Sequence, residues 1–262
     1  MSGYYTCMEG KWNPYPYFPE CIKIEDSIQG NEIGKAFGTQ NRGQLSPDQV
    51  GYCMTWGQNH FRTFDGLHYR FLGECEYTLV EDAFSGSFSI TVVNDANCPT
   101  ESNGPCSRQV KIYLQNTQVT LKQDQAGNPI VINENDEELA LPTTLYSMHI
   151  SNIAGYIVVK EQANDLMLKW DGQESIYVKV GSNLEGATAG LCGVFNHDMS
   201  DDLLVRASGN AAARTINIDG DNNSWREEIG TFGNSWAANQ GCQAISQEPA
   251  SFCESNSNEG LV

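Results

Sequence analysis

Seven short stretches between residues 110 and 180 have an apolar side chain at every second position. A period of two places every apolar residue on one face of a β-strand, whereas an amphipathic helix requires a period of 3.6. The stretches are 110–114, 119–121, 130–132, 148–150, 157–159, 166–170 and 176–180. Turn signals at 126–129 and 171–172 separate neighbouring stretches. This pattern predicts an all-β fold, an antiparallel β-sandwich or flattened barrel, with helix only after residue 222, around 225–228 and 235–238.

The charge balance narrows the classes of partner. The 262 residues include 33 acidic and 15 basic side chains, which gives a net charge of −18. A charge of this sign disfavours nucleic acid and anionic membranes as partners. No apolar run approaches the roughly 18 residues that a membrane-spanning helix needs. The composition suits an extracellular protein surrounded by divalent cations.

Nine cysteines indicate an oxidising compartment. The sequence has no Cys-x-x-Cys pair and no Cys/His spacing typical of zinc sites, so disulfides are the expected use of the cysteines. A cytosolic protein with nine structural thiols is the alternative. Because the count is odd, at least one cysteine lacks a partner within the chain.

A cluster of oxygen-bearing side chains follows Cys192. Its members are Asn196, Asp198, Ser200, Asp201 and Asp202. Carboxylates this close repel one another unless water or a hard cation neutralises them, and calcium accepts about six to eight oxygen ligands. Spacing alone leaves two interpretations open, a calcium site and a solvated acidic turn.

The first 25 residues differ from the rest. Tyr5-x-Cys7-x-x-Gly10-x-Trp12, followed by Pro19-x-Cys21, resembles the second half of a sushi (complement control protein) module. Residues 26–50 are rich in Gly, Gln, Asn and Asp and are interpreted as a linker. Residues 51–245 then form the main domain, and 246–262 a C-terminal tail.

Four separated motifs in the main domain occur in a specific order. They are Cys53-x-x-Trp56-Gly57 with the following Thr63-Phe64-Asp65-Gly66, then Trp170-Asp171-Gly172, Gly190-Leu191-Cys192-Gly193 and Phe232-Gly233-Asn234-Ser235-Trp236. Together they resemble a von Willebrand factor type D domain over about residues 50–245.

The resemblance implies one structural Ca2+ ion. In that family the ion joins the aspartate of the Thr-Phe-Asp-Gly turn to a later acidic loop. The matching ligands here are Asp65, Asn196, Asp198, Asp201 and Asp202. An alternative site, for a transition metal, would combine Asp65 with His60 and His68.

The resemblance also implies disulfides. The pairs would be Cys53–Cys192, Cys75–Cys242 and Cys98–Cys106, and Cys253 resembles the first cysteine of an eight-cysteine module. The pairing of Cys7, Cys21 and Cys253 stays open. Asn222 begins the sequon Asn-Asn-Ser and is the expected glycosylation site.

Two activities of the family are not expected here. Self-cleaving members contain Gly-Asp-Pro-His, whereas this chain has Gly-Gln-Asn-His at 57–60. Members proposed to exchange disulfides contain Cys-Gly-Leu-Cys, whereas Ala189 replaces the first of these cysteines here. A thiol relay needs an attacking and a resolving sulfur. Both departures favour a scaffold.

The sequence therefore predicts a secreted or cell-surface, calcium-binding structural module without catalysis. Its partners would be other extracellular proteins or copies of itself, as in adhesive, coagulation, mucin-like or matrix proteins. One alternative is a domain of a secreted luciferase-like oxidoreductase, which would carry two such domains and an apolar pocket with convergent polar groups. Another is a fragment of a lipid-carrier or clotting lipoprotein, which the sushi-like segment disfavours.

Overall fold

A computed structural model describes residues 50–57, 60–71, 73, 75–94, 107–114, 117–206, 214–216 and 224–239, together with the backbone of two N-terminal strands. The chain divides into two compact units, Met1–Asn41 with Gln247–Val262, and Arg42–Ser246. In the first unit, β1 (Tyr5–Met8) pairs antiparallel with β2 (Lys11–Pro14), so that Cys7 lies opposite Trp12. The rest of the predicted sushi segment, nearly all of the linker and the C-terminal tail lie outside the described residues.

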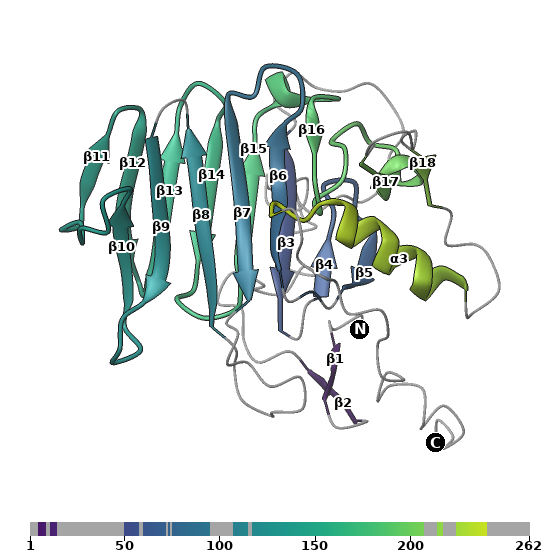
Figure 1. The fold of residues 1–262 in the computed structure, drawn as a ribbon, viewed down its shortest axis with the longest axis horizontal. Coiled ribbons are helices and arrows are strands. Elements are labelled where there is room, and N and C mark those ends of the chain that lie inside the picture. Colours follow the sequence, from purple (N-terminus) through teal and green to yellow (C-terminus); the bar gives the residue numbers. More distant parts are fainter. Residues whose placement is uncertain are drawn as a thin grey trace, which may run out of the picture. The chain divides into compact units, whose positions relative to one another are not determined.

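Two large antiparallel sheets make up most of the second unit (Figure 1). The six-stranded sheet has the order β10-β9-β8-β7-β6-β16. Its strands are β6 (Glu76–Asp82), β7 (Phe88–Asn94), β8 (Arg108–Leu114), β9 (Thr117–Gln123), β10 (Pro129–Asn133) and β16 (Thr188–Ala189).

The eight-stranded sheet has the order β11-β12-β13-β14-β15-β3-β4-β5. Its strands are β3 (Gly51–Trp56), β4 (His60–Arg62), β5 (His68–Arg70), β11 (Thr143–Leu145), β12 (Met148–Ile153), β13 (Tyr156–Glu161), β14 (Leu166–Trp170) and β15 (Ile176–Val180). β15 lies beside β3, so the last strand of this sheet in the sequence pairs with the first.

The core lies between the two sheets, as the alternation in the sequence predicts. In β14, Leu166, Leu168 and Trp170 are buried, whereas Met167 and Lys169 between them are partly exposed. The same alternation recurs in β15 and β3. Every strand pair among the described residues is antiparallel, which confirms the predicted all-β class.

Short elements complete the second unit. They are η1 (Ser182–Leu184), η2 (Met199–Asp201), β17 (Leu204–Val205), β18 (Arg214–Thr215) and the helix α3 (Ser224–Ser235). The helix predicted around 225–228 is therefore present. Among the described residues, no helix is both long and apolar enough to cross a membrane.

The prediction of helix through 235–238 was wrong beyond Ser235. There the chain extends along β6, where Thr78 N donates to Trp236 O at 2.9 Å and Ala238 N donates to Glu76 O at 2.8 Å. The edge of β6 offers free backbone hydrogen-bonding groups, and pairing with them satisfies this segment better than another helical turn.

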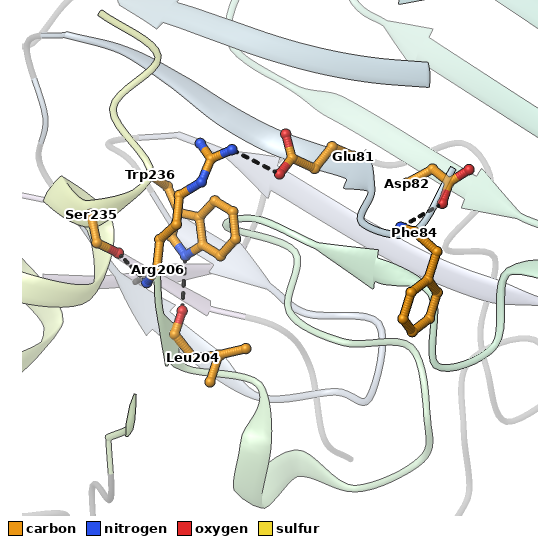
Figure 2. Close-up of polar contacts among 7 residues, drawn as sticks. All are labelled: Glu81, Asp82, Phe84, Leu204, Arg206, Ser235 and Trp236. Atoms are coloured by element: carbon orange, nitrogen blue, oxygen red, sulfur yellow. Dashed lines mark hydrogen bonds and ion pairs between the residues drawn. The ribbon is translucent and has the colours of Figure 1, made fainter. Parts of the chain in front are cut away.

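Side chains fasten the end of α3 to β17 and β6 (Figure 2). Trp236 Nε1 donates to Leu204 O at 3.0 Å, and Arg206 N donates to Ser235 Oγ at 3.0 Å. The Arg206 guanidinium lies 5.1 Å from the centroid of the Trp236 ring and donates to Glu81 Oε1 at 3.2 Å. Beside this contact, Asp82 accepts a hydrogen bond from the backbone N–H of Phe84, a residue that is 82% exposed.

Candidate metal centre

A disulfide brings the acidic loop to the start of the domain. Cys53 in β3 is bonded to Cys192, with 5.6 Å between their Cα atoms and a separation of 139 positions in the sequence. This is the pair that the family resemblance implied. Cys75 is also disulfide-bonded, and its implied partner Cys242 lies outside the described residues, as do Cys98 and Cys106.

The turn between β4 and β5 faces the segment after Cys192. Thr63 N donates to Leu67 O and Leu67 N donates to Thr63 Oγ1, which closes the turn. Phe64 N then donates to Cys192 O at 3.0 Å. The tight turn requires Gly66, whose φ is +98°. Asp65 is thereby held at the acidic loop.

Three carboxylates meet where the turn and the loop touch. Asp65, Asp201 and Asp202 each contribute an oxygen to a group whose atoms all lie within 4.8 Å of one another. The Oδ1 atoms of all three are buried and accept no hydrogen bond. Buried carboxylate oxygens without a partner are unfavourable, because they have lost their hydration and gained nothing in exchange. A hard cation supplies the missing partner.

The electrostatics of Asp202 show the cost of this arrangement. Burial, which is the largest cause, and the neighbouring carboxylates of Asp65 and Asp201 together raise its pKa to about 8, although Thr63 Oγ1 donates to its Oδ2 at 2.6 Å. Burial also raises the pKa of Asp65. The protein alone therefore disfavours full ionisation of these carboxyl groups, and a divalent cation bound between them would favour it.

The other two predicted ligands have different contacts. Asn196 Nδ2 donates to Asp201 Oδ2 at 2.7 Å, and its Oδ1 accepts from Asp198 N at 2.9 Å. Asn196 N and Asp198 N both donate to Asp65 Oδ2. The Asp198 carboxylate instead caps η2, where its Oδ1 accepts from Ser200 N and Ser200 Oγ. Asn196 and the Asp198 backbone thus position the carboxylates of Asp65 and Asp201.

Comparison with known proteins identifies the family of this chain. The sequence model of the von Willebrand factor type D domain matches residues 53–208. The chain belongs to this family.

The relatives that match this chain are much longer proteins, and the match covers a small part of each. Human otogelin is 32% identical over 227 residues, which is 86% of this chain and 7% of otogelin. Bovine von Willebrand factor is 27% identical over 209 residues, 80% of this chain and 20% of that protein. Human mucin-5AC is 34% identical over 195 residues, 72% of this chain and 3% of mucin-5AC. The chain thus spans a fifth or less of each.

Two residues at the acidic site of this type D domain were missed by sequence reasoning. Thr63 donates a hydrogen bond to Asp202. The signal in the sequence for this role was the position of Thr63, two residues before the predicted ligand Asp65. At Gly193, a Cβ would lie 2.2 Å from Asp202 Oδ1, and the φ of +75° also favours glycine. Gly193 therefore makes the space that Asp202 occupies.

The histidines of the alternative metal site lie elsewhere. Among the described residues, the cluster of His, Cys, Asp or Glu side chains suited to a metal contains Asp65, Asp201 and Asp202 but neither histidine. His60 and His68 pack instead against Trp56, with ring centroids 5.8 Å and 6.0 Å from it. The sequon at Asn222 lies outside the described residues.

Proposed function

We propose that this chain is an extracellular structural module in which a Ca2+ ion joins the β4–β5 turn to the acidic loop at 193–202. The observation that carries the proposal is the set of three buried, unpartnered carboxylate oxygens on Asp65, Asp201 and Asp202. An all-oxygen donor set suits calcium, whereas zinc prefers histidine and cysteine. When bound, the ion would neutralise the carboxylates and hold two segments that are distant in sequence.

Each protein group has a role in this proposal. Asp65, Asp201 and Asp202 supply the charged oxygens. Asn196 orients Asp201 through its side-chain amide, and the backbone N–H of Asp198 orients Asp65. Asp198 itself would complete the site by capping η2 and thereby fixing the loop between Asn196 and Asp201.

The biological role that we propose is association with other extracellular proteins or with further copies of the chain. Membership of the type D family and similarity to von Willebrand factor, otogelin and mucins support this role. The disulfide between Cys53 and Cys192 supports an oxidising, extracellular location. The sushi-like segment, within which β1 and β2 pair, would be a second module of such a protein.

Thermal unfolding at increasing calcium concentration tests the metal site. We expect calcium to stabilise the wild-type protein by about 2.7 kcal/mol at 100 times the dissociation constant. Asp202→Asn should abolish this stabilisation. The matched control is Asp136→Asn, an exposed turn position with the same change of charge. An equal response in Asp202→Asn, or none in the wild type, would refute the proposed site.

A further inference from the structure

The most exposed large apolar side chain among the described residues is Phe84, in the turn between β6 and β7. It is 82% exposed, and its ring points away from Asp82 (Figure 2). Single exposed apolar side chains are common on protein surfaces. Phe84 differs from such a side chain in how firmly its turn is held and in what surrounds it.

The carboxylate of Asp82 fixes the turn. It accepts hydrogen bonds from the backbone and side-chain donors that follow it: Phe84 N, Ser85 N, Ser85 Oγ, Ser87 N and Ser87 Oγ. Gly86 N also donates to Asp82 O at 3.1 Å, and the φ of Gly86 is +62°. Because the turn is already ordered, little backbone entropy remains to be lost when a partner covers Phe84.

Two further loops are bonded to this turn and to each other. One hydrogen bond joins each pair of loops: Ala83 N to Ala187 O at 2.8 Å, Asn164 Nδ2 to Ser87 Oγ at 3.4 Å, and Asn183 Nδ2 to Ala163 O at 3.3 Å. We name residues 83–87, 162–165 and 182–187 the three-loop surface. These bonds make it one connected surface at an end of the sandwich.

The composition of the three-loop surface is typical of a binding site for protein. Its exposed residues other than Phe84 are small or polar, and its three segments contain no Lys or Arg. The two acidic residues are Asp165, which Lys179 Nζ contacts at 2.7 Å, and Glu185. Aromatic side chains are enriched and lysine is depleted at the centres of protein interfaces. Serine, glycine and asparagine around a rigid aromatic anchor are also typical of binding loops.

We propose that the three-loop surface binds another extracellular protein, and that Phe84 is the anchor that enters an apolar pocket of that partner. This proposal rests on the association with extracellular proteins proposed above. The net charge of −18, with Asp165 and Glu185 beside the anchor, favours a partner with basic side chains around its pocket. A second copy fits less well, because it carries the same net charge. A membrane also fits less well, because anionic lipid repels the chain and one ring buries little apolar area.

Random peptides displayed on phage and selected against the wild-type chain, with calcium present, are the probe. Because a few anchors supply most of the binding energy at a protein interface, the selected peptides should gather at such an anchor. We expect most of them to combine Lys or Arg with apolar residues and to bind Phe84→Ser at least tenfold more weakly than the wild type. The control is Tyr146→Ser, which removes an aromatic ring from a residue that is 80% exposed, in the β11–β12 turn. Peptide binding to this control should stay within twofold of the wild type.

Thermal unfolding of the same variants separates the binding surface from the calcium site. Since the Phe84 side chain is exposed, Phe84→Ser should unfold at the wild-type temperature and keep the wild-type response to calcium. If the calcium site does not exist, the wild type and Phe84→Ser will both lack that response. If only the three-loop surface is misassigned, both will show the response and the selected peptides will bind both equally.

Several outcomes would overturn the proposal. It fails if no peptide is selected, if the selected peptides bind Phe84→Ser as tightly as the wild type, or if Tyr146→Ser loses as much affinity. It also fails if sedimentation shows self-association of the wild type that Phe84→Ser lacks, because the occupant would then be a second copy. Sedimentation of the wild type but not of Phe84→Ser with phosphatidylserine-containing vesicles would instead identify a membrane as the occupant.

Discussion

The hydroxyl of Thr63 donates a hydrogen bond of 2.6 Å to Oδ2 of Asp202, which lies 139 residues further along the chain. The Cys53–Cys192 disulfide and the bond from Phe64 N to Cys192 O join the same two regions. The β4–β5 turn and the acidic loop are thus already held together by the protein alone. A cation entering between them would meet a largely preformed set of oxygens, which lowers the cost of ordering the site.

Replacing Thr63 with valine removes this hydrogen bond, together with the one that Thr63 Oγ1 accepts from Leu67 N, and keeps the shape of the side chain. Because the lost donor faces a buried carboxylate, we expect the free energy of unfolding with calcium present to fall by about 1.5–3 kcal/mol. Urea denaturation monitored by tryptophan fluorescence measures it. The control is Thr144→Val, at an exposed threonine that contacts His149, where we expect a change below about 0.5 kcal/mol. Equal losses in both variants would contradict the role of Thr63.

Gly193 and Gly186 form a matched pair for testing the space around Asp202. Their φ values are +75° and +72°, but a Cβ at Gly193 would collide with Asp202, whereas one at Gly186 would meet nothing within 4 Å. Substitution by alanine strains the backbone at both positions by about 1 kcal/mol. We therefore expect Gly193→Ala to abolish calcium stabilisation and Gly186→Ala to retain it. Equal calcium responses in thermal unfolding would show that the predicted collision is relieved.

The sequence predicts the strands of this domain well because their apolar residues follow a period of two over most of the sandwich. Sheet order is harder to predict, since nothing local indicates that β15 returns to β3. The acidic loop is visible as a cluster of oxygen donors, but spacing alone does not separate Asp198, which caps η2, from Asp201, which joins the cluster. The extended segment after Ser235 depends on the distant edge of β6, which a helix-forming local sequence does not reveal.

Loss of the Cys53–Cys192 disulfide should weaken the whole domain. The bond closes a loop of 139 residues and joins two buried side chains. In the chain-entropy relation, a loop of this length corresponds to about 5 kcal/mol. We expect Cys53→Ala/Cys192→Ala to lose most of this amount in urea denaturation and to bind calcium more weakly. A variant that unfolds at the same urea concentration as the wild type would contradict this prediction.

His60 should make the folded domain sensitive to acid. Burial, together with the positive charges of Arg70 and Arg108, lowers its pKa from 6.5 to about 4. His60 binds a proton more readily in the unfolded chain than in the folded one. As the pH falls, the unfolded state is therefore protonated first, and the free energy of unfolding decreases between about pH 6.5 and 4. The expected loss between pH 7 and pH 4 is on the order of 2 kcal/mol.

The unfolding temperature measured from pH 7 to pH 4 checks this prediction. His60→Gln should flatten the profile, because glutamine takes up no proton in either state. His149→Gln, at an exposed position on β12, should leave it unchanged. Carboxylates that titrate near pH 4 affect all three proteins alike, so the difference between the profiles isolates His60. Parallel profiles for the wild type and His60→Gln would show that His60 takes up its proton equally well in the folded and unfolded states.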